Sequence, residues 1–184
     1  MRKKKLILSL LILVIVCSVG YSTYRIFNYS GNKKIHFLDH SLASKNIEEV
    51  LKSPEFKGKV VYVDIWASWC GECIKQFPYA KSLKTHFRAE PIAYLYISYN
   101  NKFRIDHQTK WKALIKKNNL EGYHLEVNKD FYEDLWSRIK TSTTEKITIP
   151  RYLIVGKDGK IVNKNAANPE SEAIVYEQIQ KALQ

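Results

Sequence analysis

The stretch that decides the fold is Val60-Val-Tyr-Val-Asp-Ile-Trp-Ala-Ser-Trp-Cys-Gly-Glu-Cys-Ile-Lys-Gln-Phe-Pro78. Residues 60–67 are β-branched, aromatic or otherwise apolar except for Asp64, which predicts a central strand covered on both faces. Cys70 and Cys73 follow at the start of a predicted helix. A buried strand that leads directly into Cys-x-x-Cys at a helix start is typical of a reactive dithiol.

The spacing of the two cysteines predicts different roles for them. A thiol attacks as its thiolate, and a helix N-terminus can lower a cysteine pKa from about 8.5 to roughly 3.5–7.5. The cause is the helix dipole together with the unpaired first-turn N–H groups. Cys70 is therefore the predicted exposed nucleophile. Cys73, one turn deeper, is predicted to resolve the mixed disulfide, so the predicted chemistry is thiol–disulfide exchange.

Two carboxyl groups lie close to the dithiol in the sequence. Asp64 is inside the apolar strand, where burial raises the pKa of an unpaired carboxyl. We expect it to take the proton of Cys73; the alternative is that it points to a polar edge. Glu72 lies between the cysteines, where its charge would raise the Cys70 pKa and favour the disulfide. The alternative for Glu72 is an exposed first-turn residue stabilised by the helix dipole.

The remaining segments alternate between predicted strands and helices. Strands are expected at 35–38, 60–67, 91–99, 123–127, 151–155 and 160–162, and helices at 44–52, 71–87, 106–119, 130–139 and 168–183. Ser44 is the expected cap of the first helix, and Pro78 should kink the second. Asp158-Gly159 predicts a hairpin turn. This order predicts an α/β fold with parallel early strands, right-handed crossovers and an antiparallel hairpin at one side.

The N-terminus has the pattern of an exported protein. Residues 1–5 form a basic tail, and no further charge appears until Arg25. The uncharged stretch approaches the length of about 20 residues that a spanning helix needs, and it lacks a clean cleavage site. We expect a signal anchor at 6–27 with the N-terminus in the cytoplasm, followed by a tether at 28–34. A cleaved signal peptide is the alternative. Cys17 is interpreted as an apolar residue of this segment.

Length and composition limit the other functions. The chain has 184 residues, 45% of them hydrophobic, which suits one domain plus an extension. Its three cysteines are too few for a disulfide framework. The net charge is +12, of which +5 lies in residues 1–27. The rest contains no basic run longer than a pair and no nucleic-acid motif, so we expect a solvated basic surface and no nucleic-acid partner.

Residues 60–78 resemble the thioredoxin superfamily through Asp64-x-Trp66-Ala67-x-Trp69-Cys70-Gly71-x-Cys73, with Pro78 five residues later. Ile149-Pro150 is similar to the family's cis-proline, and Asp158-Gly159 to its closing hairpin turn. The resemblance implies a thioredoxin-like α/β fold over 35–184, with a central mixed sheet flanked by helices. It also implies that Cys70 is the nucleophile, that Cys73 resolves, that Asp64 is the buried proton acceptor, and that Ile149-Pro150 packs against the dithiol and binds substrate backbone.

The anchor, the elements before residue 60 and the insert at about 103–146 resemble the exported, membrane-tethered branch, which includes thioredoxin-like proteins of cytochrome c maturation. This implies a bacterial enzyme on the extracytoplasmic side of the cytoplasmic membrane, which reduces protein disulfides with electrons from a membrane donor. Its only redox group would be the Cys70–Cys73 pair, with no other cofactor. The candidate substrate-binding residues are Trp69, Gly71, Glu72, Ile149 and Pro150. Glu72 replaces the proline common in thioredoxin, so the potential of thioredoxin does not transfer. Arg151 is expected to place a charge beside the active-site groove.

Two other functions were weighed. A copper- or zinc-handling protein would use the same cysteine pair, but metal sites require further ligands. The five histidines, at 36, 40, 86, 107 and 124, are scattered, so we expect no metal site. A peroxidase of the same fold would need a lone reactive cysteine, and the Cys-x-x-Cys pair replaces it.

Overall fold

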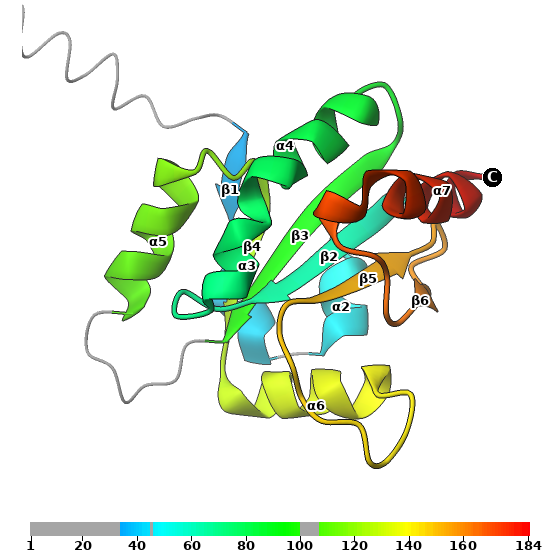
Figure 1. Ribbon diagram of the computed structural model, residues 1–184. Coiled ribbons are helices and arrows are strands. Elements are labelled where there is room, and N and C mark those ends of the chain that lie inside the picture. The colour runs from blue at the N-terminus through cyan, green and yellow to red at the C-terminus, as the bar shows by residue number, and fades with distance from the viewer. Residues whose placement is uncertain (1–33, 45, 100–106) are drawn as a thin grey trace, which may run out of the picture. The chain divides into compact units, whose positions relative to one another are not determined.

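The centre of the fold is a mixed sheet of six strands in the order β1-β4-β3-β2-β5-β6 (Figure 1). The structure is a computed structural model, and it describes residues 34–44, 46–99 and 107–184. The strands are β1 Ile35–Phe37, β2 Val60–Trp66, β3 Ile92–Tyr99, β4 Gly122–Val127, β5 Arg151–Val155 and β6 Ile161–Asn163. β2 pairs in parallel with β3 and antiparallel with β5. The strand that leads to the two cysteines is therefore central, as predicted.

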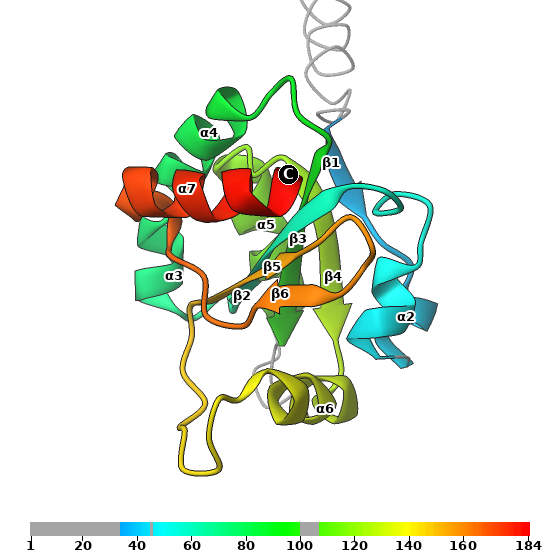
Figure 2. The ribbon, with the colours of Figure 1, turned by 90° about the vertical axis from the view of Figure 1, so that its right-hand side faces the viewer.

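Helices cover both faces of this sheet. They are α2 Ile47–Leu51, α3 Gly71–Lys75, α4 Phe77–His86, α5 His107–Lys117, α6 Lys129–Ile139 and α7 Glu172–Leu183, with short 3₁₀ helices η1 His40–Ser44 and η2 Pro169–Ser171. α3, α4 and α7 lie on one side of the sheet and α2 on the other (Figure 2). Together with parallel β1, β3 and β4 and the antiparallel β5–β6 hairpin, this confirms the predicted α/β architecture.

All seven residues of β2 are buried, because the strand has a core on each face. Val61, Val63 and Ile65 belong to the cluster that includes residues of α2 and α6. The alternate residues Tyr62 and Trp66 belong to the clusters on the α3, α4 and α7 side. Full burial of each aliphatic side chain contributes roughly 1.5–3 kcal/mol. The strand register thus fixes Asp64 on the same face as Tyr62 and Trp66.

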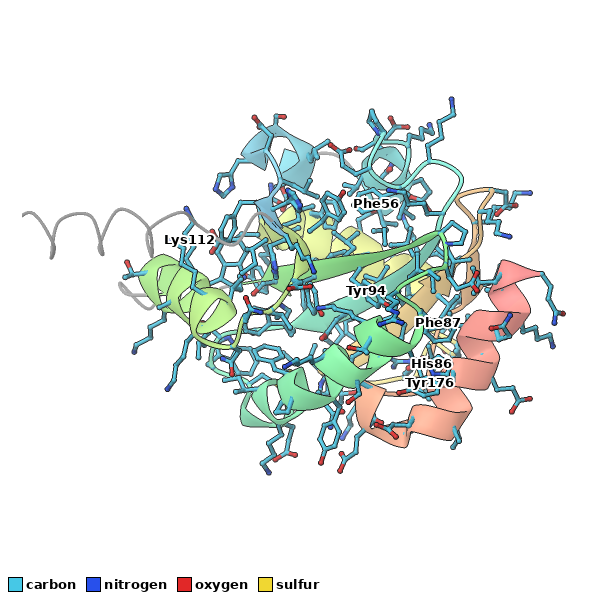
Figure 3. All side chains as sticks on the ribbon, turned by 90° about the horizontal axis from the view of Figure 1, so that it is seen from above. Phe56, His86, Phe87, Tyr94, Lys112 and Tyr176 are labelled. Atoms are coloured by element: carbon cyan, nitrogen blue, oxygen red, sulfur yellow. A yellow bond between two sulfur atoms is a disulfide. The ribbon has the colours of Figure 1, made fainter. Side chains whose placement is uncertain are left out.

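An aromatic contact joins α4 to α7 on that face. The rings of His86 and Tyr176 stack with their centroids 4.1 Å apart. Phe87 meets Tyr176 edge-on at 5.6 Å, and the three side chains lie together in Figure 3. This contact holds the C-terminal helix against the helix that follows the dithiol.

The single kinked helix predicted over 71–87 is wrong, because α3 ends at Lys75 and α4 begins at Phe77. Pro78 is the second residue of α4 and has no N–H to donate to the carbonyl of Ile74. The backbone N–H of Gln76 donates to the carbonyls of Cys73 and Ile74 instead. The helix breaks there, so the cysteines lie on a separate short helix.

The first predicted helix also differs from the structure. The segment predicted at 44–52 contains the end of η1 and then α2, which begins at Ile47. Asn46 rather than Ser44 caps α2, since its Oδ1 accepts from the backbone N–H of Glu49 at 3.0 Å. Asparagine and serine are similarly good caps, so residue type did not distinguish the two positions.

The predicted signal anchor at 6–27, including Cys17, and tether residues 28–33 lie outside the described residues. Within the described ranges, no helix is both long enough and apolar enough to span a membrane. The compact unit that contains the sheet runs from Lys34 to Gln184.

Candidate active site

The two cysteines lie at the N-terminus of α3, directly after the central strand. Cys70 is the N-cap residue, and its Sγ accepts from the backbone N–H of Cys73 at 3.2 Å. The two sulfurs form a disulfide, with their Cα atoms 5.3 Å apart. Cys70 keeps 7% of its surface exposed and Cys73 none. Cys70 is thus the cysteine that an external sulfur can reach, and after reduction its backbone donor and the helix terminus favour a thiolate.

The predicted cis peptide between Ile149 and Pro150 is confirmed. The carbonyl oxygen of Ile149 lies 3.9 Å from Cys70 Sγ. Both residues are partly exposed, immediately before β5 begins at Arg151. The cis-proline segment therefore lies beside the reachable sulfur.

The other three candidate substrate-binding residues lie on the open side of the disulfide. Trp69 is 53% exposed. Gly71 is exposed, and a Cβ built on it would meet no atom within 4 Å. Glu72 is exposed and pairs with Lys75 at 2.6 Å, which favours its interpretation as a first-turn residue. A surface ion pair of this kind contributes about 0–1 kcal/mol.

Asp64 is buried in the middle of β2, with 3% of its surface exposed. Its cross-strand neighbours are Tyr96 on β3 and Tyr152 on β5. Its Oδ1 has no hydrogen-bond partner among the residues that the structure describes. Burial raises the Asp64 pKa to about 8, against a smaller lowering by the charge of Lys84. The alternative of a polar edge is wrong, and the carboxyl lies on the face of the sheet that carries the dithiol.

Lys84 is a charged residue that acts on Asp64 and that the sequence analysis missed. Its Nζ lies 4.9 Å from the ring centroid of Tyr96 and 5.3 Å from that of Tyr94, and it donates to the backbone carbonyl of Glu121. Burial lowers the Lys84 pKa to about 7. Its burial could have been predicted from the sequence, because Lys84 follows buried Ala80 by four residues and so lies on the same face of α4.

The expectation that Arg151 places a charge beside the groove is wrong. Arg151 is buried, forms an ion pair with Glu145, and lies with its guanidinium carbon 5.3 Å from the Trp136 ring centroid. Strand alternation places it on the same face as Leu153 of β5, opposite to Asp64. Hydrogen bonds from Thr141 and Arg151 lower the Glu145 pKa to about 2, so the pair stays ionised.

The metal alternative has little support in the described part of the chain. No group of three or more His, Cys, Asp and Glu side chains able to hold an ion occurs there. His124 is fully buried, with its Nε2 2.8 Å from the carbonyl oxygen of Leu120. It is therefore a core histidine that contacts the backbone.

A family model described as Redoxin matches residues 31–179. The chain belongs to the Redoxin family. Thiol-disulfide oxidoreductase ResA of Bacillus thuringiensis subsp. konkukian is 26% identical over 171 residues, which cover 89% of each chain. A ResA of Bacillus cereus is likewise 26% identical, over 172 residues and 89% of each chain.

A solved structure supports the fold independently. The thioredoxin domain of a thiol-disulfide oxidoreductase from Bacteroides vulgatus superposes with a TM-score of 0.56 at 22% identity, covering 71% of this chain and 83% of that one. The predicted membership of the thioredoxin superfamily is confirmed, and so is the thioredoxin-like fold with a mixed sheet flanked by helices. The chain is a thiol–disulfide oxidoreductase, and Cys70–Cys73 is its disulfide.

Proposed function

We propose that this enzyme reduces disulfides of exported proteins, on the extracytoplasmic side of the bacterial cytoplasmic membrane. The observation that carries the reaction is the asymmetry of the disulfide at the start of α3, where Cys70 is reachable and Cys73 is fully buried. The basic tail 1–5 and the uncharged stretch after it support export and anchoring by residues 6–27.

The reaction begins from the reduced dithiol. The Cys70 thiolate attacks one sulfur of the substrate disulfide, forms a mixed disulfide, and releases the other substrate sulfur as a thiolate, which takes a proton from solvent. Cys73 then loses its proton and attacks Cys70 Sγ. The bond to the substrate breaks, its second thiolate leaves and is protonated, and the Cys70–Cys73 disulfide forms. Two electrons have moved to the substrate, whose disulfide has become two thiols.

Asp64 is the proposed acceptor for the Cys73 proton. Its pKa of about 8 lies close to the ordinary thiol value of about 8.5. Near-matched values allow transfer in both directions near neutral pH. Trp66, two residues along the same face of β2, belongs to the cluster that contains Cys73, so the strand directs the carboxyl toward the buried cysteine. The same group would return the proton when the disulfide is reduced again.

The surface around the disulfide fits an extended polypeptide. Two apolar side chains close in sequence to the site residues are strongly exposed, Trp69 before Cys70 and Ile147 before the cis-proline. The Ile149–Pro150 backbone lies beside Cys70. Exposed apolar side chains next to backbone groups favour binding of the main chain of a substrate over recognition of one particular substrate side chain. Proteins of cytochrome c maturation are the substrate class that the sequence resemblance suggests.

A dithiol of a membrane protein is the proposed electron donor. It would attack the Cys70–Cys73 disulfide by the same exchange in reverse, leaving its own disulfide behind. Because compartments outside the cytoplasm lack the reducing thiol pools of the cytosol, the enzyme needs such a donor for every turnover.

The full-length chain tests the activity directly. Cys70→Ser should abolish the reduction of insulin by dithiothreitol above the uncatalysed rate, while Cys17→Ser should keep full activity. Cys73→Ala should trap substrates as mixed disulfides on Cys70, and mass spectrometry would identify them. Undiminished insulin reduction by Cys70→Ser would refute the assigned nucleophile.

The location has a separate test. Alkaline phosphatase, which is active only outside the cytoplasm, would be fused after residue 34 of the chain. High phosphatase activity in the membrane fraction supports an exported, anchored domain. Activity only in the soluble extracytoplasmic fraction indicates a cleaved signal peptide, and no activity contradicts export.

A further inference from the structure

A cavity of about 480 Å³ lies between α4, the turn after α5 and the start of β1. Neither cysteine lines it, so it is separate from the dithiol. Five of its described lining residues are basic and Glu121 is the single acid; the five are Lys34, Lys81, Lys84, Arg88 and Lys117. A hollow lined by charge of one sign focuses the electric field and concentrates counter-ions.

Helix termini explain only part of this charge. Lys84 and Lys117 lie in the last turns of α4 and α5, where cations compensate the helix dipole. Arg88 directly follows the C-cap residue of α4, but Lys34 and Lys81 have no such position. Two cations from different segments, Lys34 before β1 and Lys81 on α4, therefore lie at the cavity for a reason other than helix capping.

Glu121 does not neutralise the lining. Its Oε2 lies 3.6 Å from Lys34 Nζ, so its carboxylate is already engaged with one of the five cations. Lys84 bonds the backbone carbonyl of Glu121. With all groups ionised, the lining keeps a net charge of +4.

Lys84 connects the cavity to the interior. Its ammonium lies over the rings of Tyr94 and Tyr96 on β3, and Tyr94 is labelled beneath α4 in Figure 3. Burial disfavours the charged form of this lysine. An anion bound in the cavity would stabilise the Lys84 ammonium in place of the water that it has lost. Anion binding at this position is therefore favourable.

We propose that this cavity binds a phosphate group, held by Lys81, Lys84, Arg88 and Lys117. Lys81 and Lys84 are three residues apart on α4 and so face the same side. Arg88 lies in the turn just after the end of α4 and also lines the cavity. Arginine and lysine are the usual phosphate ligands, arginine through two parallel hydrogen bonds. The amides of Asn118 and Asn119, which also line the cavity, add neutral polar groups.

The same phosphate chemistry has two sources, a soluble phosphate and the headgroup of an anionic lipid. Lys34 ends the seven-residue tether 28–34, which spans at most about 25 Å when extended. The lipid source requires the membrane anchor proposed above, and the soluble source does not. The two sources are distinguished below, and the cavity itself does not depend on the anchor.

The test is calorimetric titration of the full-length chain with inorganic phosphate, in dodecyl maltoside micelles, which contain no phosphate. We expect saturable binding. The double variant Lys81→Gln/Arg88→Gln, at two exposed positions, should weaken it at least tenfold, because two charge-assisted hydrogen bonds are lost. Circular dichroism would verify that the variant is folded.

The matched control is Lys57→Gln/Lys116→Gln, which removes the same charge from exposed positions outside the cavity. It should bind phosphate within twofold of the original chain. Absence of saturable binding, or an equal loss in both double variants, would overturn the proposal. Micelles doped with phosphatidylglycerol separate the sources: a weaker apparent phosphate affinity in the original chain indicates that the headgroup occupies the cavity, and an unchanged affinity indicates a soluble phosphate.

Discussion

Two neighbouring strands each bury one charged side chain, and the two residues have opposite surroundings. Asp64 on β2 has Oδ1 without a hydrogen-bond partner among the described residues, and its pKa is raised to about 8. Arg151 on β5 has three interaction partners: a carboxylate, a backbone carbonyl oxygen 3.4 Å from its Nη1, and an aromatic ring. Ile65, next to Asp64, is the cross-strand partner of Arg151. The two charges are thus close in the sheet but on opposite faces.

The difference separates a group that titrates from one that does not. A buried charge without a partner changes its protonation state, because desolvation favours the neutral form. A buried charge with a partner and further hydrogen bonds stays ionised and fixes structure. Asp64 therefore titrates near neutral pH, which its proposed role as proton acceptor requires. Arg151 holds the side chain of Glu145 against β5. The following changes test this contrast, from the largest expected effect to the smallest.

Asp64→Asn should slow disulfide reduction about 100-fold at pH 7, because Cys73 loses its proton acceptor. The original enzyme should gain activity as the pH rises toward 8, while the variant should show no such rise. Stopped-flow reduction of a peptide disulfide measures both. Arg151→Met, on the other face, should stay within threefold of the original rate, and equal losses in the two variants would contradict the contrast.

The stability of the oxidised enzyme should also depend on Asp64. Its folded-state pKa of about 8 exceeds the unfolded value of 3.8, so the unfolded state releases this proton first. Stability is therefore full below pH 4 and is lost as the pH rises toward 8. Relative to Asp64→Asn, the original chain should lose about 2.4 kcal/mol of unfolding free energy between pH 4 and pH 6. Urea unfolding at several pH values measures this, and parallel curves would contradict it.

Arg151→Met should destabilise the fold without this pH signature. We expect a loss of about 2 kcal/mol, because Glu145 loses its partner and Trp136 loses a stacked cation. The loss should be constant from pH 5 to pH 7, since the Glu145 pKa of about 2 leaves it ionised throughout. Urea unfolding again measures the change, and a variant as stable as the original chain would show that the pair is not structural.

Lys84→Met should have the smallest effect. The charge of Lys84 lowers the Asp64 pKa, so its removal should raise that pKa further. The carboxyl carbon of Asp64, labelled with ¹³C, reports the titration by NMR. A lower Asp64 pKa in the variant would mean that Lys84 acts on the site by another route.

The sequence predicts those structural features that are determined within a single segment of the chain. The run Val60–Trp66 predicted a central strand because no polar residue except Asp64 interrupts it. The Cys70–Cys73 spacing predicted both the helix start and the order of burial. Ile149–Pro150 required the resemblance to a family, since the spacing of those two residues indicates nothing about a cysteine that lies far earlier in the chain.

The remaining features depend on contacts between distant segments. Lys84 lies on α4, and only the packing of that helix over Tyr94 and Tyr96 brings its charge to Asp64. Arg151 was assigned to the groove from its position after Pro150. Its true face follows from the alternation of β5, where the apolar residue Leu153 shares its side. The break at Gln76 was missed because a proline predicts a disturbed helix without fixing whether it bends or stops.

The sequence separation of 79 between Cys70 and Ile149 has a consequence for how the enzyme is made. During synthesis, the two cysteines are made long before β5 and the cis-proline segment. Closing so long a loop is slow, so the central strand acquires its second neighbour late. Until then Cys73 has no cover from that side and either cysteine is open to wrong partners. A newly made molecule is therefore most vulnerable to mispaired disulfides before the last fifth of the chain, residues 150–184, has been synthesised.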